Sequence, residues 1–398
     1  MYKLINQIQD YDWGCRNAIS EFFSLKNHKN IPMAEIWMGA HPKLSSKILV
    51  DDELINLDEF ILHNPVMALG EVNYKRFSRL PYLFKILAAD KPLSIQVHPN
   101  LPAAKKGFLK ENKIGLPLSS SFRNYQDDNH KPELIYALSK FSAMNGFREL
   151  KEISRFLSDL DLNISQTKEF IANPDFSKLE SLFIYLLTLK EGVKVDYLSH
   201  LIKYSENRKY SPWKDITEIS KYWPNDVGLF MPLLLNIIVL EPGDAMFLDA
   251  CTPHAYLKGL GLEIMASSDN VLRAGLTNKH IDINELFSNV NFLSKPYDEL
   301  LCNPVKYENF IKYQVPVDDF EMSILDVNGE YTVGNNNSPI IAFCLHGSIE
   351  FYDGINYIES NIGESIFIPA RNLSFHVSGK GKLVLASVGN NEFTVDHN

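Results

Sequence analysis

Three segments of the sequence carry side chains of the types that bind metal ions. Gln96 and His98 stand two positions apart in an alternating segment, so on a strand they project from one face with Cα atoms about 6–7 Å apart. Glu133 closes a polar run, and His254 follows an apolar segment that ends at Leu248. Histidines, a carboxylate and an amide oxygen form the kind of ligand set that a catalytic zinc ion uses, with one position left for water or substrate.

Each of these segments also has a purely structural interpretation. A histidine beside a proline is more often part of a turn or of a hydrogen-bonded core than a metal ligand, and Lys131-Pro132-Glu133 is typical of a solvated turn. The spacing along the chain does not show that the segments meet in space. The residues by themselves therefore leave both interpretations open.

The pattern of apolar residues predicts strands towards both ends of the chain and helices between them. Residues 36–98 combine apolar and β-branched runs with Pro, Gly and Asp clusters, which is typical of strands. Apolar residues recur at helical spacing within 147–222 and predict a helical block. Residues 240–253 and 362–369 share a strand–turn–strand pattern, a weak internal repeat that favours two related barrels.

These patterns predict a mainly β fold made of two jelly-roll barrels with a helical insertion. Residues 1–146 and 223–300 would form the first, catalytic barrel, because the helical domain of residues 147–222 interrupts it. Residues 301–398 would form the second barrel.

Composition and charge restrict the class of protein and its partners. The chain has 398 residues, 45% hydrophobic and 22% charged, as expected for a globular protein of two or three domains. Its net charge of −10 argues against nucleic acid or an anionic membrane as the main partner, but not against a cationic pocket for a small anion. The N-terminal residues lack the pattern of a signal peptide, and the most apolar run, 231–240, is too short to cross a bilayer. Four cysteines lie far apart without a CxxC pair, so we expect a cytoplasmic protein.

Longer strings of residues resemble one known family. YQDDNHKPE (125–133) resembles the first signature of the type I mannose-6-phosphate isomerases, a phosphomannose isomerase family of the cupin superfamily. HAYLKGLGLEIMASSDNVLRAGLT (254–277) resembles the second signature. Long strings of rare residue types seldom agree by chance, so the resemblance is specific over at least residues 10–150 and 230–280. The other similar strings are YDWG (11–14), EIWMGAHP (35–42), LSIQVHP (93–99) and AMNGF (143–147).

The resemblance implies a fold, a cofactor and a reaction. It implies a pair of cupin-type barrels and the interconversion of D-mannose 6-phosphate and D-fructose 6-phosphate through a cis-enediol. This reaction would feed mannose and GDP-mannose metabolism. The family's single zinc ion per chain would be held by the four side chains already nominated: Gln96, His98, Glu133 and His254.

The reaction needs a base, an electrophile for the developing enediolate oxygen and an anchor for the phosphate. Zinc would act as the electrophile or would only position the substrate, and the sequence leaves both roles open. The resemblance places the catalytic arginine at Arg273, whose planar and permanently charged group suits an enediolate or a phosphate. The candidates for proton transfer or charge stabilisation are Glu263, His130 and Lys131.

Three residues are candidates for binding the phosphate. Ser94 shares the predicted strand face of the first two ligands. Lys85 lies within an apolar segment, where its charge needs an internal acid or a bound anion as a partner. Lys279 follows Asn278 where the family usually has Pro-Lys, so this departure changes a loop but keeps the lysine.

Two other classes of function stay open at this point. Another metal-dependent cupin enzyme, such as an oxygenase or a different sugar-phosphate isomerase, would use a similar set of ligands. Iron oxygenases bind their metal through two histidines and one carboxylate. A sugar-binding protein without activity would also use cupin barrels. His346 and His376 are isolated, so we expect no metal in the C-terminal barrel. We expect a small sugar phosphate as the partner of a monomeric chain that needs no protein partner.

Overall fold

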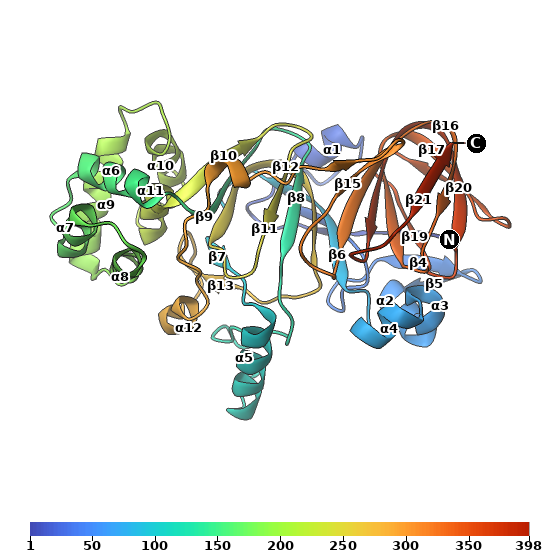
Figure 1. Cartoon of the computed structure of the whole chain (residues 1–398), viewed down its shortest axis with the longest axis horizontal. Helices are drawn as coiled ribbons and strands as arrows, with labels where there is room; N and C mark the ends of the chain where they lie inside the picture. The colour runs from blue at the N-terminus through green and yellow to red at the C-terminus, as the bar shows by residue number, and fades with distance from the viewer. Residues whose placement is uncertain (398) are drawn as a thin grey trace.

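The computed structural model describes residues 1–397, which form two large sheets and a group of helices (Figure 1). The ten-stranded sheet consists of β2 (Gln7–Gln9), β3 (Glu35–Met38), β6 (Tyr82–Ala89), β7 (Gln96–Val97), β8 (Glu133–Ala137), β9 (Phe141–Phe147), β10 (Leu235–Leu240), β11 (Ala245–Leu248), β12 (His254–Ala266) and β13 (Leu272–Arg273). The nine-stranded sheet consists of β1 (Tyr2–Lys3), β14 (Val305–Lys306), β15 (Phe310–Tyr313), β16 (Glu321–Gly334), β17 (Ile340–Tyr352), β18 (Tyr357–Asn361), β19 (Ser365–Ile368), β20 (Ser374–Ser387) and β21 (Thr394–His397). A separate hairpin pairs β4 (Lys47–Val50) with β5 (Glu53–Asn56).

Strand β12 organises the ten-stranded sheet. Its first residues pair with β7 and β9, and from Gly259 onwards it pairs with β6 and then also with β8. Gly259 has φ +143°, and a Cβ atom there would lie 2.7 Å from the Cα of Phe141, so this position requires glycine. The change of partners at this glycine lets one strand carry both His254 and Glu263.

The two large sheets share a hydrophobic core. Every residue of β6 is buried, which is typical of a strand covered on both faces. The ring of Phe84 in β6 contacts that of Phe343 in β17 with centroids 6.1 Å apart, and Phe343 also contacts Phe23 at 5.4 Å. Apolar side chains from both sheets thus join one buried cluster, which fixes the sheets against each other.

A group of helices lies at the end of the molecule opposite the nine-stranded sheet (Figure 1). The predicted helical spacing is confirmed in the first of them, because Ile153, Phe156 and Leu157 are all buried on one face. Trp213 is fully buried within the group, and its ring contacts that of Phe156. The prediction of a helical insertion is therefore correct. Its elements are α6 (Leu150–Leu160), α7 (Ser165–Ala172), α8 (Phe176–Leu187), α9 (Glu191–Ser205) and α10 (Trp213–Ser220), followed by η1 (Val227–Phe230) and α11 (Met231–Leu234).

The expectation of strands throughout residues 36–98 is wrong between β5 and β6. Phe60 and Ile61 are buried there on one face of a short helix. Pro65 begins the next helix, and Gly70, with φ +79°, separates that helix from the third. Short helices divided by such breakers resemble punctuated strands in sequence. They are α2 (Leu57–His63), α3 (Pro65–Leu69) and α4 (Glu71–Phe77).

The mainly β fold is confirmed, whereas the two closed barrels stay a prediction, since the strand order leaves both sheets open within residues 1–397. None of the described helices has the length and apolar character needed to cross a membrane. Helix α5 (Leu101–Lys113) projects from the ten-stranded sheet in Figure 1. The remaining elements are α1 (Ala18–Phe22), α12 (Ile283–Phe287) and η2 (Tyr297–Glu299).

Truncation of a core leucine in the helical group tests the packing. Leu182 in α8 is fully buried, so Leu182→Ala is expected to lower the free energy of unfolding by about 2–5 kcal/mol, through lost burial and a residual cavity. Leu62 in α2 is 75% exposed and serves as a matched control, for which Leu62→Ala changes stability by less than about 0.5 kcal/mol. Urea unfolding followed by circular dichroism measures both, and equal midpoints for the two variants would contradict the packing.

Candidate metal centre

His98, Glu133 and His254 meet in the ten-stranded sheet. Glu133 begins β8 and His254 begins β12, while His98 directly follows β7. Nε2 of His98 lies 3.3 Å from Oε1 of Glu133, and Nε2 of His254 lies 3.5 Å from Oε2. One ligand atom from each residue lies within 4.8 Å of the others, and all three side chains are buried. The fold therefore brings together three of the four predicted ligands.

Backbone carbonyl groups fix the tautomers of both histidines. Nδ1 of His98 lies 2.7 Å from the carbonyl oxygen of Asn270, and Nδ1 of His254 lies 2.9 Å from that of Thr252. A carbonyl oxygen only accepts hydrogen bonds, so each neutral ring carries its proton on Nδ1 and leaves the lone pair of Nε2 towards Glu133. This arrangement is typical of histidines that bind a metal through Nε2.

The resulting contacts between acceptors require a cation. Nε2 of His98 is buried without a hydrogen-bond partner among the described residues, and its lone pair faces a carboxylate oxygen. Two buried acceptors facing each other cost free energy unless a positive charge lies between them. The donor set of two imidazole nitrogens and one carboxylate suits zinc. The side chains present therefore fit the predicted metal ion.

The charge state of the cluster suits metal binding. Burial, together with the positive charge of Lys131, lowers the pKa of His98 to about 4, so this ring is neutral at pH 7. Burial opposes the charge of Glu133, but Lys131, whose Nζ lies 2.9 Å from Oε1, and the contacts with His98 and His254 together hold the pKa of this carboxyl well below its usual range. The cluster thus offers the anion of Glu133 and the neutral ring of His98 without any change of protonation.

The side chain of Asn270 holds the carbonyl group that orients His98. Its Oδ1 accepts from the backbone N–H of Gln126 at 2.7 Å, and its Nδ2 donates to the carbonyl oxygens of Asp127 and Asn129, each at 2.8 Å. Asn270 is fully buried. It thereby joins the loop before β8 to the loop after β12, the two segments of the signature strings.

Gln96 and Arg273 lie next to the cluster by strand register. Gln96 pairs with His254 on one side and with Arg273 of β13 on the other. Nε2 of Gln96 donates to Oγ of Ser94 at 3.4 Å, a weak hydrogen bond. Gln96 as the fourth ligand stays a prediction.

Arg273 is a cation without an acid. Its side chain is partly buried and forms no ion pair or hydrogen bond with the described residues, and burial lowers its pKa. Lys279 is an exposed residue whose pKa is lowered by partial burial and then by the charge of Arg273. Two cations without acids favour a bound anion.

Comparisons with known proteins agree with this geometry. Family models match the chain in succession: the catalytic domain of phosphomannose isomerase type I over residues 1–150, its helical insertion domain over 156–235, and the cupin domain of mannose-6-phosphate isomerase over 309–388. The mannose-6-phosphate isomerase of Escherichia coli K12 is 45% identical over 384 residues, which cover 96% of this chain and 98% of that protein. The chain belongs to the type I phosphomannose isomerase family.

Relatives from other organisms support the same family membership. The mannose-6-phosphate isomerase of Homo sapiens is 32% identical over 383 residues, with 88% of each chain covered. A crystal structure of mannose 6-phosphate isomerase from Salmonella typhimurium, bound to its substrate and to zinc, superimposes with a TM-score of 0.94. That protein is 45% identical, and the match covers 98% of this chain and 99% of that one.

In this member of the phosphomannose isomerase family, a second buried network lies next to the metal centre. Nζ of Lys85 lies 2.7 Å from Oε2 of Glu263 and 3.5 Å from Oε1 of Glu35, and it lies over the ring of Trp37. Tyr256 donates to Oε1 of Glu263 at 2.8 Å. The structure therefore supplies the internal acid that the sequence left open as a partner for Lys85.

Burial and charge act in opposite directions in this network. Burial opposes the charge of Lys85, but Glu263, Glu35 and Glu133 outweigh it and raise its pKa, so the ammonium group stays charged. Burial raises the pKa of Glu263 against the opposing effect of Lys85. Burial followed by the charge of Glu263 also raises the pKa of Tyr256, which stays a hydrogen-bond donor. Lys85 therefore neutralises carboxylates of the protein.

The structure places His130 at the contact between the two sheets. Its Nε2 lies 2.8 Å from Oδ2 of Asp319, which directly precedes Phe320 and β16 of the nine-stranded sheet. The residues that the sequence analysis did not nominate are Asn270, Glu35, Tyr256 and Asp319. Three of them lie in the signature strings or the similar string 35–42, but their role depends on long-range contacts that the sequence does not reveal.

Loss of the carboxylate is expected to weaken zinc binding. Glu133→Gln removes the only negative charge of the three-residue cluster. Loss of a residue that only hydrogen-bonds to a metal ligand typically lowers metal affinity by about 10–100-fold, so loss of this ligand should lower the affinity for zinc by more. Competition with a chromogenic zinc chelator measures this affinity. Glu71, which is exposed and paired with Lys75, gives the matched control Glu71→Gln. An unchanged affinity in Glu133→Gln would contradict the assignment.

Removal of Lys85 is expected to destabilise the protein. Lys85→Met leaves the buried carboxylates of Glu263 and Glu35 without their cation, so the free energy of unfolding should fall by about 3–5 kcal/mol. The exposed Lys75 pairs with Glu71, and the control Lys75→Met should change it by less than about 0.5 kcal/mol. Urea unfolding measures both. Glu263→Gln removes one of the two uncompensated charges, so the double variant Lys85→Met/Glu263→Gln should regain part of the lost free energy of unfolding. No recovery in the double variant would contradict this explanation.

Proposed function

We propose that this chain interconverts D-mannose 6-phosphate and D-fructose 6-phosphate, with one zinc ion held by His98, Glu133 and His254. The observation that carries the proposal is the buried contact between acceptors, in which the free Nε2 of His98 faces the carboxylate of Glu133. The zinc and the substrate bound to the Salmonella typhimurium relative support the same cofactor and substrate. Zinc bound here would polarise a substrate oxygen and stabilise developing negative charge. Gln96, from its register beside His254, would complete the ligand set.

The cations at the edge of the centre suit an anionic substrate. Arg273 and Lys279 carry positive charge without acidic partners among the described residues, so a phosphate or an enediolate would satisfy them. The hydroxyl group of Ser94, which is close to Gln96, offers an additional donor to the same region. We assign the phosphate to Arg273 and Lys279, because Lys85 is already neutralised by carboxylates of the protein.

Isomerisation through a cis-enediol requires a proton to move between C1 and C2. His130 has the arrangement of a general base: its contact with the carboxylate of Asp319 holds a proton on Nε2, which leaves Nδ1 able to accept one. Lys131 supplies a positive charge that would favour the enediolate. Glu263 is committed to Lys85 and Tyr256 and would support the site from behind.

The remaining parts of the proposal concern organisation and context. We propose a catalytic cupin barrel formed by residues 1–146 and 223–300, a helical domain of residues 147–222 and a second cupin barrel of residues 301–398. Helices α6 to α10 lie within the proposed helical domain, and the change of partners along β12 supports a rolled first sheet. The chain would act as a monomer in the cytoplasm, where its product would feed GDP-mannose synthesis.

A coupled assay of mannose 6-phosphate conversion tests the reaction and the metal together. Protein stripped of metal is expected to be inactive and to regain turnover when zinc is added, because Nε2 of His98 is buried without a hydrogen-bond partner in the described chain and the cluster is arranged to hold an ion. Turnover that needs oxygen would instead support the cupin oxygenase. A zinc-loaded protein that is inactive on this sugar would remove the substrate assignment and leave the metal site.

Arg273→Ala separates substrate binding from metal binding. Loss of a charged partner of the substrate is expected to lower kcat/KM by at least about 100-fold, which corresponds to the about 3 kcal/mol of a charge-assisted contact. Zinc content should be unchanged, because Arg273 is not part of the ligand cluster. The exposed Arg155 in α6 gives the control Arg155→Ala. Full activity of Arg273→Ala would overturn its role.

A further inference from the structure

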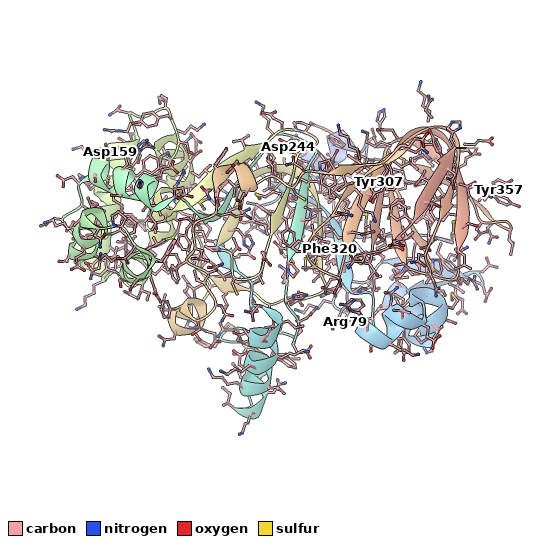
Figure 2. The ribbon with its side chains drawn as sticks, in the orientation of Figure 1. Arg79, Asp159, Asp244, Tyr307, Phe320 and Tyr357 are labelled. Carbon is pink, nitrogen blue, oxygen red and sulfur yellow. The ribbon has the colours of Figure 1, made fainter. Side chains whose placement is uncertain are left out.

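The nine-stranded sheet carries a second cavity that shares no residue with the metal centre. Its volume is about 500 Å³, within the range of small-molecule sites. It lies where β14 and β15 meet the segment that follows β20. Tyr307 and Phe320, labelled in Figure 2, both line it. Its other lining residues include Phe310, Lys312, Glu321, Asn391, Glu392 and Phe393.

One wall of this cavity is aromatic. The rings of Tyr307 and Phe310 are stacked with centroids 4.5 Å apart and an interplanar angle of 5°. The ring of Phe310 also contacts that of Phe393 at 5.1 Å. Tyr307 is 45% exposed, which leaves part of its ring and its hydroxyl group accessible. Such a wall offers a flat apolar surface with a polar edge.

Another part of the cavity lining consists of buried polar groups. Nζ of Lys312 lies 2.9 Å from Oε1 of Glu321 and donates to the backbone oxygen of Asn391 at 2.8 Å. Asn391 is 4% exposed, and neither Oδ1 nor Nδ2 of its side chain has a hydrogen-bond partner within residues 1–397. A buried amide without partners is rare in native proteins, so this side chain needs a donor and an acceptor that the described residues do not supply.

The charges of the cavity exclude an anionic ligand. Lys312 is the only cation among the lining residues, and Glu321 already neutralises it. Glu392 adds a further negative charge to the lining. This balance is opposite to that of the metal centre, where Arg273 and Lys279 have no acidic partner in the described chain. The second cavity therefore selects against a phosphate group.

We propose that this cavity binds a neutral hexose. A pyranose ring has an apolar face of C–H groups and a rim of hydroxyl groups that both donate and accept hydrogen bonds. The face fits the exposed ring of Tyr307, and the rim fits the amide of Asn391, which needs one donor and one acceptor. The site would be independent of zinc, since no lining residue belongs to the metal cluster.

Titration of the zinc-loaded full-length chain with D-mannose, followed by saturation-transfer NMR, tests the proposal. The Arg273→Ala background weakens binding of the phosphorylated sugar at the metal centre, and dependence on Tyr307 identifies the D-mannose that binds at the cavity. In this background we expect saturable binding of D-mannose, weakened at least tenfold by Tyr307→Ala, and no binding of mannose 6-phosphate at the cavity. Tyr307 is partly exposed, so its substitution leaves the core intact.

Tyr357 provides the matched control on the same sheet. It is 74% exposed and its ring stacks on Tyr352 with centroids 4.3 Å apart, but it does not line the cavity. Figure 2 labels it apart from Tyr307. Tyr357→Ala should bind D-mannose as the parent does. The proposal would be overturned by absence of saturable binding of D-mannose, D-glucose and D-galactose, or by equal binding in Tyr307→Ala and its parent.

Discussion

The metal centre depends on one constraint, which is that three acceptors share a buried space. Two backbone carbonyls keep the protons of His98 and His254 on Nδ1, so the remaining nitrogens and the carboxylate of Glu133 all present lone pairs to one another. Acceptors that face one another cannot form hydrogen bonds, because none of them carries the proton that a donor needs. The cation that relieves this constraint also provides the Lewis acid that the proposed isomerisation needs, so folding and chemistry place the same demand on the site.

The buried charges around the metal centre are balanced in two groups of residues. Lys131 balances Glu133 directly, while Lys85 balances Glu263 and Glu35 in the adjoining network. Strand β12 supplies a residue to each group: His254 lies before Gly259 and Glu263 lies after it. A single strand thereby couples the position of a ligand to that of the supporting carboxylate. His130, through its contact with Asp319, links this region to the nine-stranded sheet.

Much of this could be predicted from local patterns. Alternation placed Gln96 beside His98, and helical spacing identified α6 and α8, because both patterns follow directly from backbone geometry. The helices of residues 57–77 were missed, since prolines, glycines and short length hide their periodicity. The partners of Lys85, the carbonyl of Asn270 and the contact between His130 and Asp319 were beyond reach. These contacts join residues at least 172 positions apart for His98 and 189 for His130, and no local pattern encodes such distances.

The helical group enters and leaves the sheet at neighbouring positions. Phe147 at the end of β9 and Leu235 at the start of β10 are direct partners in the ladder. Without the intervening helices, these strands would form an ordinary hairpin that a turn of a few residues could close. The helices are thus a very long hairpin loop whose hydrophobic core includes side chains of the sheet. Chain connectivity sets almost no limit on what such a loop contains. The limit comes instead from Met144, Phe147 and the other apolar side chains of the sheet that the helices cover.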